Sequence, residues 1–254
     1  MKCAMLIVAI AALVTATPTF SQVQNLSDDS WKFEATPYFW AAGVEGWSRI
    51  GANTPTAYFD ADFSDVFRNL DFGAMGSFEA RKGRWGILFD GIYIKFSQKS
   101  DPLLGGALGT EDLSAKQTIL QLAGAYRVFD GSSLAVDVLA GVRYTYVDGD
   151  ISLSASSLLP NGLSRGDHAS WTDGFGGVRA VFALTDNWSF TGYLDGGAGG
   201  TKHSWQLLTS ANYAFSKTFV AKVGYRILSM DYEKPDFLYN MKTKGFFAGV
   251  GIRF

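Results

Sequence analysis

Apolar and polar residues alternate with a period of two along most of the chain from Trp31 onward. Successive side chains of a β-strand point to opposite faces, so this period predicts strands rather than helices. The segment 245–254, GFFAGVGIRF, shows the pattern clearly, with one face made of Phe246, Ala248, Val250, Ile252 and Phe254. A terminal segment of an ordinary soluble domain would fray and expose polar groups. We therefore expect an all-β protein whose strands carry an unusually apolar face.

We predict ten strands, each a run of alternating residues bounded by turn-forming residues. They are expected at 31–44, 71–82, 84–97, 115–128, 134–148, 170–183, 188–199, 203–215, 218–232 and 243–254. Residues 54–62 also alternate weakly, and a strand there would have to be balanced by another, so eight or twelve strands are alternatives.

The links between these strands alternate in length. Short turns are expected at 82–84, 129–133, 185–187 and 216–218, and longer links at 45–70, 98–114, 149–169 and 233–242. Only the tight link near 199–202 departs from the pattern. Short periplasmic turns, long outer loops and an even strand number are typical of antiparallel transmembrane β-barrels.

The composition agrees with strands that cross a membrane. Hydrophobic residues make up 47% of the chain and charged residues 18%. Beyond the N-terminus there is no run of about 18 or more apolar residues, so a transmembrane helix is not expected. The net charge of −2 gives no basic surface for nucleic acid, and we expect no nucleic-acid partner.

The positions of the aromatic residues separate a membrane barrel from a soluble β-sandwich, which would also alternate. Beside the short turns lie Trp85, Tyr126, Phe182, Trp188, Phe215, Phe219 and Phe254. At the other strand ends lie Trp40, Tyr93, Tyr144, Tyr146, Trp171 and Trp205. Aromatic residues at both strand ends are typical of the two girdles of a membrane barrel.

The N-terminus predicts a secretory signal peptide. Lys2 precedes an apolar run over 3–16, and cleavage is expected after Ser21, with Ala16 as the alternative. We assign 1–21 to the signal peptide, 22–30 to a short periplasmic segment and 31–254 to the barrel; a retained membrane anchor is the alternative to the signal peptide. Cys3, the one cysteine, would leave with it, so no disulfide is expected.

Two segments resemble a known class of proteins. The terminal pattern Phe246, Val250, Ile252 and Phe254 resembles the C-terminal membrane-insertion signal of Gram-negative outer-membrane proteins. The opening 31–40, WKFEATPYFW, resembles the first strand of a group of small OmpA-like or porin-like outer-membrane barrels. The resemblance covers about 31–254. It implies an outer-membrane location among lipid and lipopolysaccharide, and recognition of the terminal signal by the barrel-assembly machinery. It specifies no activity, and the sequence assigns no oligomeric state.

The faces expected to point inward carry nearly balanced charges. The candidate lumen charges are Glu34, Glu79, Arg81, Asp90, Arg127, Asp137, Arg143, Asp173, Arg179, Asp195, Lys222 and Arg226, together with Lys32 and Arg253. Side chains can fill the interior of a narrow barrel, and desolvated charges are tolerated when they are paired. The sequence therefore predicts either an interlocked ionic core or a thin polar pore for small solutes.

Two local features stand out in the first half of the chain. Pro37 lies within the first strand and lacks a backbone N–H, which predicts a bulge or a locally unpaired position. Residues 63–70 predict a short helix with Ser64 as its N-cap and with Phe63, Phe67 and Leu70 on one side. This helix could pack on its own strands, or fold into the barrel mouth as a plug.

Signals for catalysis or metal binding are weak. His168 and His203 are the only histidines, and both are expected near outer strand ends. The acids Asp148 and Asp150 do not match a calcium loop. We expect no enzyme, no cofactor and no metal.

The sequence thus predicts a structural or envelope role, or a narrow passive pore. The alternatives are surface binding or adhesion through loops 45–70, 98–114 and 149–169, and a rim hydrolase acting on lipid A or peptides.

Overall fold

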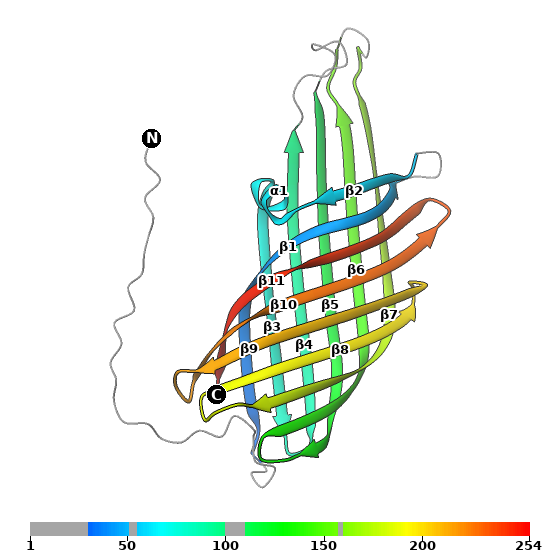
Figure 1. Cartoon of the computed structure of the whole chain (residues 1–254). Coiled ribbons are helices and arrows are strands. Elements are labelled where there is room, and N and C mark those ends of the chain that lie inside the picture. Colours follow the sequence, from blue (N-terminus) through cyan, green and yellow to red (C-terminus); the bar gives the residue numbers. More distant parts are fainter. Residues whose placement is uncertain (1–29, 51–54, 100–109, 157–159) are drawn as a thin grey trace, which may run out of the picture.

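The protein folds into a closed antiparallel β-barrel (Figure 1). The computed structural model describes residues 30–50, 55–99, 110–156 and 160–254. Eleven strands form one sheet, and ten of them close into a ring because β11 pairs with β1 as well as with β10. The predicted signal peptide, and all but the last residue of the segment after it, lie outside the described residues.

All ten predicted strands are present. Their bounds are β1 (Lys32–Ile50), β3 (Leu70–Lys82), β4 (Trp85–Lys99), β5 (Glu111–Asp130), β6 (Leu134–Leu153), β7 (Leu163–Ala183), β8 (Trp188–Gly199), β9 (His203–Ala214), β10 (Phe219–Lys234) and β11 (Phe237–Arg253). Several extend beyond their predicted ends on the long-loop side, so β5, β6 and β7 rise above the shorter β8 and β9 (Figure 1). Among the described residues, no helix is long and apolar enough to cross a membrane.

The weak alternation over 54–62 does produce a strand, but not a barrel strand. β2 (Ala57–Ala61) pairs with the upper part of β1, from Val44↔Ala61 to Ser48↔Ala57. It lies outside the ring and needs no balancing strand. The expectation that a strand here would change the barrel count is therefore wrong, because a strand can add to one edge of the barrel without entering its circuit.

The predicted helix forms as α1 (Phe63–Arg68), but its cap differs from the prediction. Asp62, not Ser64, is the N-cap: its carboxylate accepts from the Asp65 backbone N–H at 3.0 Å and from the Ser64 hydroxyl at 2.7 Å. These hydrogen bonds, that of Ser64 first, hold the pKa of the Asp62 carboxyl below its usual range. A charged carboxylate is the stronger acceptor for the free N–H groups of a helix start.

α1 does not plug the lumen. None of its residues is buried, and the rings of Phe63 and Phe67 lie 6.0 and 6.3 Å from the ring of Phe39. Phe39 points outward from β1, so α1 packs on the outside of the wall. The alternative prediction, a helix that packs on its own strands, is confirmed.

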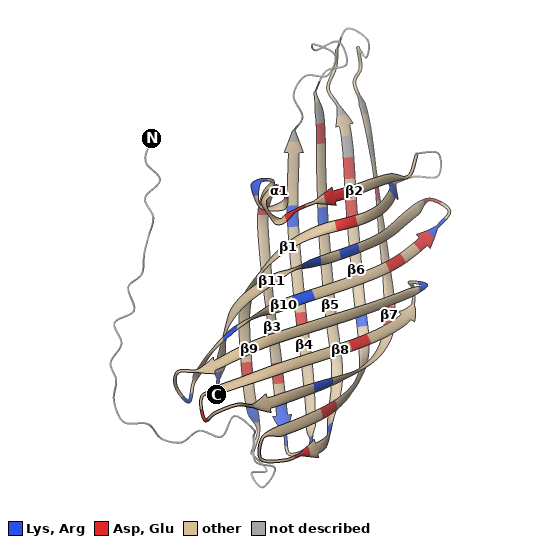
Figure 2. Cartoon of the chain, in the orientation of Figure 1, with Lys and Arg blue, Asp and Glu red and all other residues tan. Residues whose placement is uncertain are grey.

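Strand faces follow the predicted alternation. On β6, Val138 and Val142 are exposed, while their sequence neighbours Asp137 and Arg143 are buried. On β11, Phe246 is 67% exposed and Phe247 is buried. Charged residues interrupt the strands only at scattered positions (Figure 2). The outer surface of the barrel is therefore largely apolar, as the hydrocarbon of a membrane requires.

Pro37 marks a break in the hydrogen-bonded wall. The pairing of β1 with β3 runs from Lys32↔Arg81 and stops at Pro37↔Gly76. On the other edge, the pairing of β1 with β11 skips Thr36 and Pro37. The prediction of a locally unpaired position is confirmed, because proline brings no donor to either ladder.

The barrel interior as candidate functional site

A cluster of three arginines around one carboxylate ties four strands together near the short turns. Asp137 of β6 is 1% exposed. It accepts from Arg81 of β3 at 3.0 Å, from Arg127 of β5 at 2.9 Å and from Arg179 of β7 at 2.7 Å. Hydrogen bonds between ionised groups are about twice as strong as neutral ones. Asp137 is therefore the centre of the lower charge layer.

Two glutamates extend this lower layer around the ring. Arg179 donates to both carboxylate oxygens of Glu79, at 2.7 and 2.8 Å. Glu34 of β1 pairs with Lys222 of β10 and accepts from Arg253 of β11 at 2.8 Å. Each carboxylate of the layer thus meets at least two cations.

A second layer lies above the first, centred on Arg226 of β10. Its guanidinium donates to Asp90 of β4 at 2.9 Å, to the Tyr38 hydroxyl of β1 at 2.9 Å and to Gln206 of β9 at 2.6 Å. The Tyr38 hydroxyl in turn donates to Asp90 at 2.8 Å. Because β4 and β10 are not neighbours in the ring, these bonds cross the lumen.

The same level holds a fully buried ion pair. Arg143 of β6 donates to both carboxylate oxygens of Asp195 of β8 at 2.7 Å, and neither side chain is exposed. Tyr193 also donates to Asp195 at 2.7 Å. Asp173, the neighbour of Arg143 on β7, is buried and accepts from the Thr201 backbone N–H at 2.8 Å.

The structure places twelve of the candidate lumen charges inside the barrel and divides them between these two layers. The other two, Lys32 and Arg253, also line the cavity of the lumen. Their neutral partners, Tyr38, Tyr193 and Gln206, were not predicted from the sequence. The period-two alternation could have identified Tyr38 as an inward residue, because it lies four residues beyond Glu34 and therefore shares its face of the strand. The membrane-insertion signal residues lie on the other face: Phe246, Val250 and Phe254 are exposed and Ile252 is half-buried. Their role in assembly stays a prediction.

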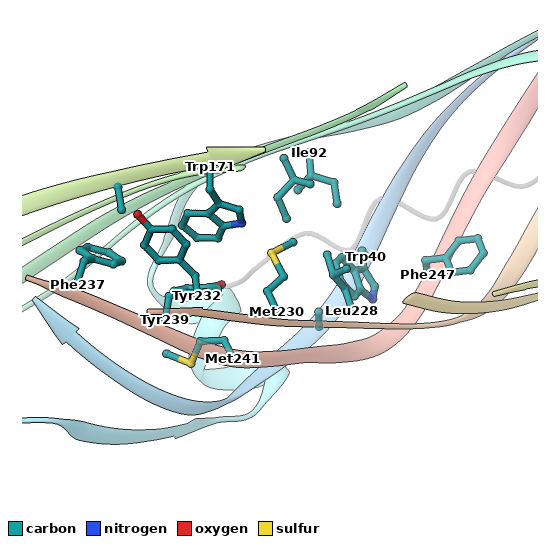
Figure 3. Close-up of a cluster of buried hydrophobic side chains, with 13 residues drawn as sticks. Trp40, Ile92, Trp171, Leu228, Met230, Tyr232, Phe237, Tyr239, Met241 and Phe247 are labelled. Carbon is teal, nitrogen blue, oxygen red and sulfur yellow. The ribbon is translucent and has the colours of Figure 1, made fainter. Parts of the chain in front are cut away.

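The outer half of the lumen holds an apolar cluster (Figure 3). Its residues are Trp40, Ala42, Ile92, Ile119, Ala169, Trp171, Leu228, Met230, Tyr232, Phe237, Tyr239, Met241 and Phe247. The rings of Trp171 and Tyr232 stack with centroids 4.3 Å apart, which joins β7 to β10 above the low turn between β8 and β9. The Arg226 guanidinium lies 5.0 Å from the Trp40 ring, so the cluster rests on the second charge layer.

This cluster corrects two predicted girdle residues. Trp40 and Trp171 were expected at the membrane interface, but they are 4% and 5% exposed and point inward. Both lie near strand ends, which was the reason for the prediction. Their parity indicates the inner face, because Trp40 lies two residues beyond Tyr38, and Trp171 two before Asp173. Position along a strand sets depth, whereas parity sets the face.

A cavity of about 260 Å³ lies in the half of the lumen nearer the short turns. Its lining combines charged residues of both layers, among them Glu34, Glu79 and Arg226, with apolar residues such as Leu139 and Val220. Within the described residues, no three His, Cys, Asp or Glu side chains gather as a metal-binding group. The site's chemistry is that of charges paired with one another.

The two histidines contact different residues. His168, on the outer end of β7, has its ring centroid 5.9 Å from that of Tyr146. His203, at the start of β9, has Nδ1 3.9 Å from a carboxylate oxygen of Asp231. Ser204, beside His203, is buried and accepts from Arg143 at 3.2 Å. In the part of the chain that the structure describes, neither histidine joins a serine and a carboxylate in the hydrogen-bonded arrangement that a serine hydrolase needs.

Comparison with known proteins places the fold. The chain is similar to the outer-membrane protease OmpT of Escherichia coli, with a TM-score of 0.53 and 10% identity over 91% of this chain and 100% of that one. For the translocator domain of the autotransporter NalP from Neisseria meningitidis, the TM-score is 0.43 and the sequence identity is 14%, over 88% of each chain. For a major outer membrane protein from Thermus thermophilus, the TM-score is 0.42 and the sequence identity is 14%, over 89% of this chain and 100% of that one.

No protein-family model matches the chain, and neither does any curated protein. At these identities the likeness to OmpT shows the fold and not the activity. The chain has the closed antiparallel barrel fold of outer-membrane proteins.

Proposed function

We propose that this protein is an integral outer-membrane β-barrel of a Gram-negative bacterium with a structural role in the envelope. The apolar outer face supports the membrane location, because surface aromatic and aliphatic residues on every side of a soluble monomer would promote aggregation. Outer-membrane lipid and lipopolysaccharide would surround the barrel. The terminal signal would be read by the barrel-assembly machinery.

The side chains that cross the lumen support a structural role rather than a passive pore. Two layers of paired charges cross the lumen, and the apolar cluster lies above them. Narrow apolar constrictions exclude water and so block ions. Between the two predicted interiors, the observed pairing therefore favours the interlocked ionic core.

A conductance measurement tests this role. We expect the purified protein to insert into planar bilayers and to show no discrete current steps in about 1 M KCl. A triple variant, with Arg226→Ala, Trp171→Ala and Tyr232→Ala, removes the cross-lumen brace and the largest ring stack of the apolar cluster. We expect this variant to conduct.

The matched control keeps both interior layers. Trp85→Ala and Trp188→Ala remove two outward rings of the short-turn girdle, and this variant should stay silent. Discrete, salt-dependent current steps from the unmodified protein would contradict the structural role and favour the pore. Vesicle flotation establishes that each variant has inserted.

A further inference from the structure

The barrel wall is interrupted between β1 and β3 in its outer half. Their pairing stops at Pro37↔Gly76, and from Val44 onward β1 pairs with β2 instead. Residues 38–43 of β1 and 70–75 of β3 are all described, and no backbone pair joins them. β1 leans away from the upright β3 above the short-turn end (Figure 1). We call this stretch the β1–β3 seam; six residues of strand make it about 20 Å long.

The outer side of the seam is apolar and covered by α1. Phe39 of β1 and Phe72 of β3 point outward and are 43% and 57% exposed. In hydrocarbon, every unpaired backbone group costs several kcal/mol, so such an edge requires a cover. The rings of Phe63 and Phe67 supply one by packing against Phe39.

This cover is lightly attached. α1 has six residues and none of them is buried. A helix this short has little stability of its own. The barrel's hydrogen-bonded ladders run through other residues, so α1 can move without breaking them. It is therefore a part of the wall that can be displaced at small cost.

The inner side of the seam is apolar too. Trp40 and Ala42 of β1 belong to the buried apolar cluster, and Met75 of β3 packs against it. Ile92 and Ile94 of β4 lie behind them. Below this stretch, Asp90 and Arg226 are paired with each other. At its outer end, Asp71 of β3 lies 3.8 Å from Lys95 and accepts from the Ser97 hydroxyl. A molecule that passed through the seam would meet apolar side chains first.

We propose that the β1–β3 seam is a lateral opening through which a hydrocarbon chain of an outer-half lipid reaches the apolar cluster, with α1 as its displaceable cover. The inference rests on the membrane location proposed above. Apolar surroundings on both sides of the seam select hydrocarbon over a polar solute. The length of the seam also fits, because one leaflet has about 15 Å of hydrocarbon.

Cysteine reporters test the opening in phosphatidylcholine vesicles. Ala42→Cys places a thiol just inside the seam, and Ala169→Cys places one in the same cluster on β7. The two positions are matched in burial, at 9% and 7% exposed. N-dodecylmaleimide, which dissolves in the bilayer, should modify the thiol at position 42 at least tenfold faster than that at 169. Cys3 is replaced by serine if it is retained.

The cover is tested in the same assay. Phe63→Ser with Phe67→Ser removes the two rings that hold α1 on Phe39, and should raise the rate at position 42 at least threefold without changing that at 169. Phe215→Ser with Phe219→Ser removes a stacked outward pair elsewhere and should change neither rate. If the Ala42→Cys protein does not fold, Met75→Cys reports from the other edge of the seam.

The outcomes separate the seam from the membrane location. Equal rates at 42 and 169, or no response to loss of the two phenylalanines, would overturn the seam proposal. Protection of position 42 together with a doubled particle mass in nanodiscs would also overturn it, since a second copy would then occupy the unpaired edge. Failure of the unmodified protein to float with vesicles would instead refute the proposed membrane location.

Discussion

Replacing Asp137 with asparagine is expected to lower the free energy of unfolding by about 3–5 kcal/mol, the cost of breaking a buried ion pair. The substitution keeps the shape of the side chain but removes the charge that faces Arg81, Arg127 and Arg179. Glu79 remains beside Arg81 and Arg179, whereas Arg127 keeps Asp130 at the short turn. The cations of the lower layer already outnumber its carboxylates, so the substitution would increase the excess of positive charge there.

Urea unfolding of the vesicle-inserted protein, followed by tryptophan fluorescence, measures this loss. Glu45→Gln is the matched control, because Glu45 also pairs with more than one cation, Lys242 at 3.4 Å and Lys244 at 2.6 Å. Those lysine side chains are each 44% exposed, and solvent-exposed pairs contribute at most about 1 kcal/mol. If Asp137→Asn costs no more than Glu45→Gln, the lower charge layer is not what stabilises the barrel.

A second variant shows whether the loss comes from uncompensated charge. Arg127→Met combined with Asp137→Asn removes one cation along with the carboxylate. The double variant should be more stable than the sum of its two single variants predicts, because each single change leaves an unpaired partner behind. Strict additivity would mean that Asp137 and Arg127 do not act as a pair.

The period-two pattern predicted the strands and their faces because a membrane barrel must satisfy both at once. Every outward residue meets lipid and every backbone group needs a strand partner, so the alternation persists for the length of each strand. The alternation alone therefore assigns Val138 and Asp137 to opposite faces of β6. The same pattern does not define the strand ends, because above the membrane the requirement for an apolar face no longer holds. β7 accordingly begins at Leu163, before its predicted start.

Partners across the lumen could not be predicted in the same way. Glu79 of β3 meets Arg179 of β7, 100 residues later in the chain, and Asp90 of β4 meets Arg226 of β10, 136 residues later. Such meetings depend on strand tilt and on the stagger of the whole barrel, which no local pattern encodes. The sequence therefore indicated which charges point inward, and the closed ring determined which of them meet.

The consequence of Pro37 shows a similar limit. The missing N–H was visible in the sequence, but its effect depends on the pairing of the next residues along β1. Over Val44–Ser48, β1 pairs with β2 and not with β3. The helix α1, which follows β2, packs on the outer side of β1. A single local defect thus becomes an interrupted seam because a neighbouring strand is present to take over the pairing.

Replacing Phe254 with alanine is expected to reduce assembled barrel in cells at least tenfold while leaving the purified protein nearly as stable as before. In the structure, Phe254 closes the ring: its backbone N–H and C=O exchange 3.0 Å hydrogen bonds with Phe33. Alanine keeps both bonds. Only the stacking of the Phe254 ring on Phe33, with centroids 5.6 Å apart, is lost. One such aromatic pair contributes roughly 1 kcal/mol beyond its buried area.

A large effect in cells with a small effect on stability would separate recognition from folding energy. Phe219→Ala is the matched control, since Phe219 belongs to the same girdle and stacks on Phe215 at 5.9 Å. It should lower the folded, heat-modifiable band in the outer-membrane fraction less than twofold. Equal losses of assembled barrel for Phe254→Ala and Phe219→Ala would mean that Phe254 acts only as one more interfacial ring. The contribution of a girdle ring should not depend on which strand supplies it. A signal that the assembly machinery reads should instead depend on its place at the end of the last strand.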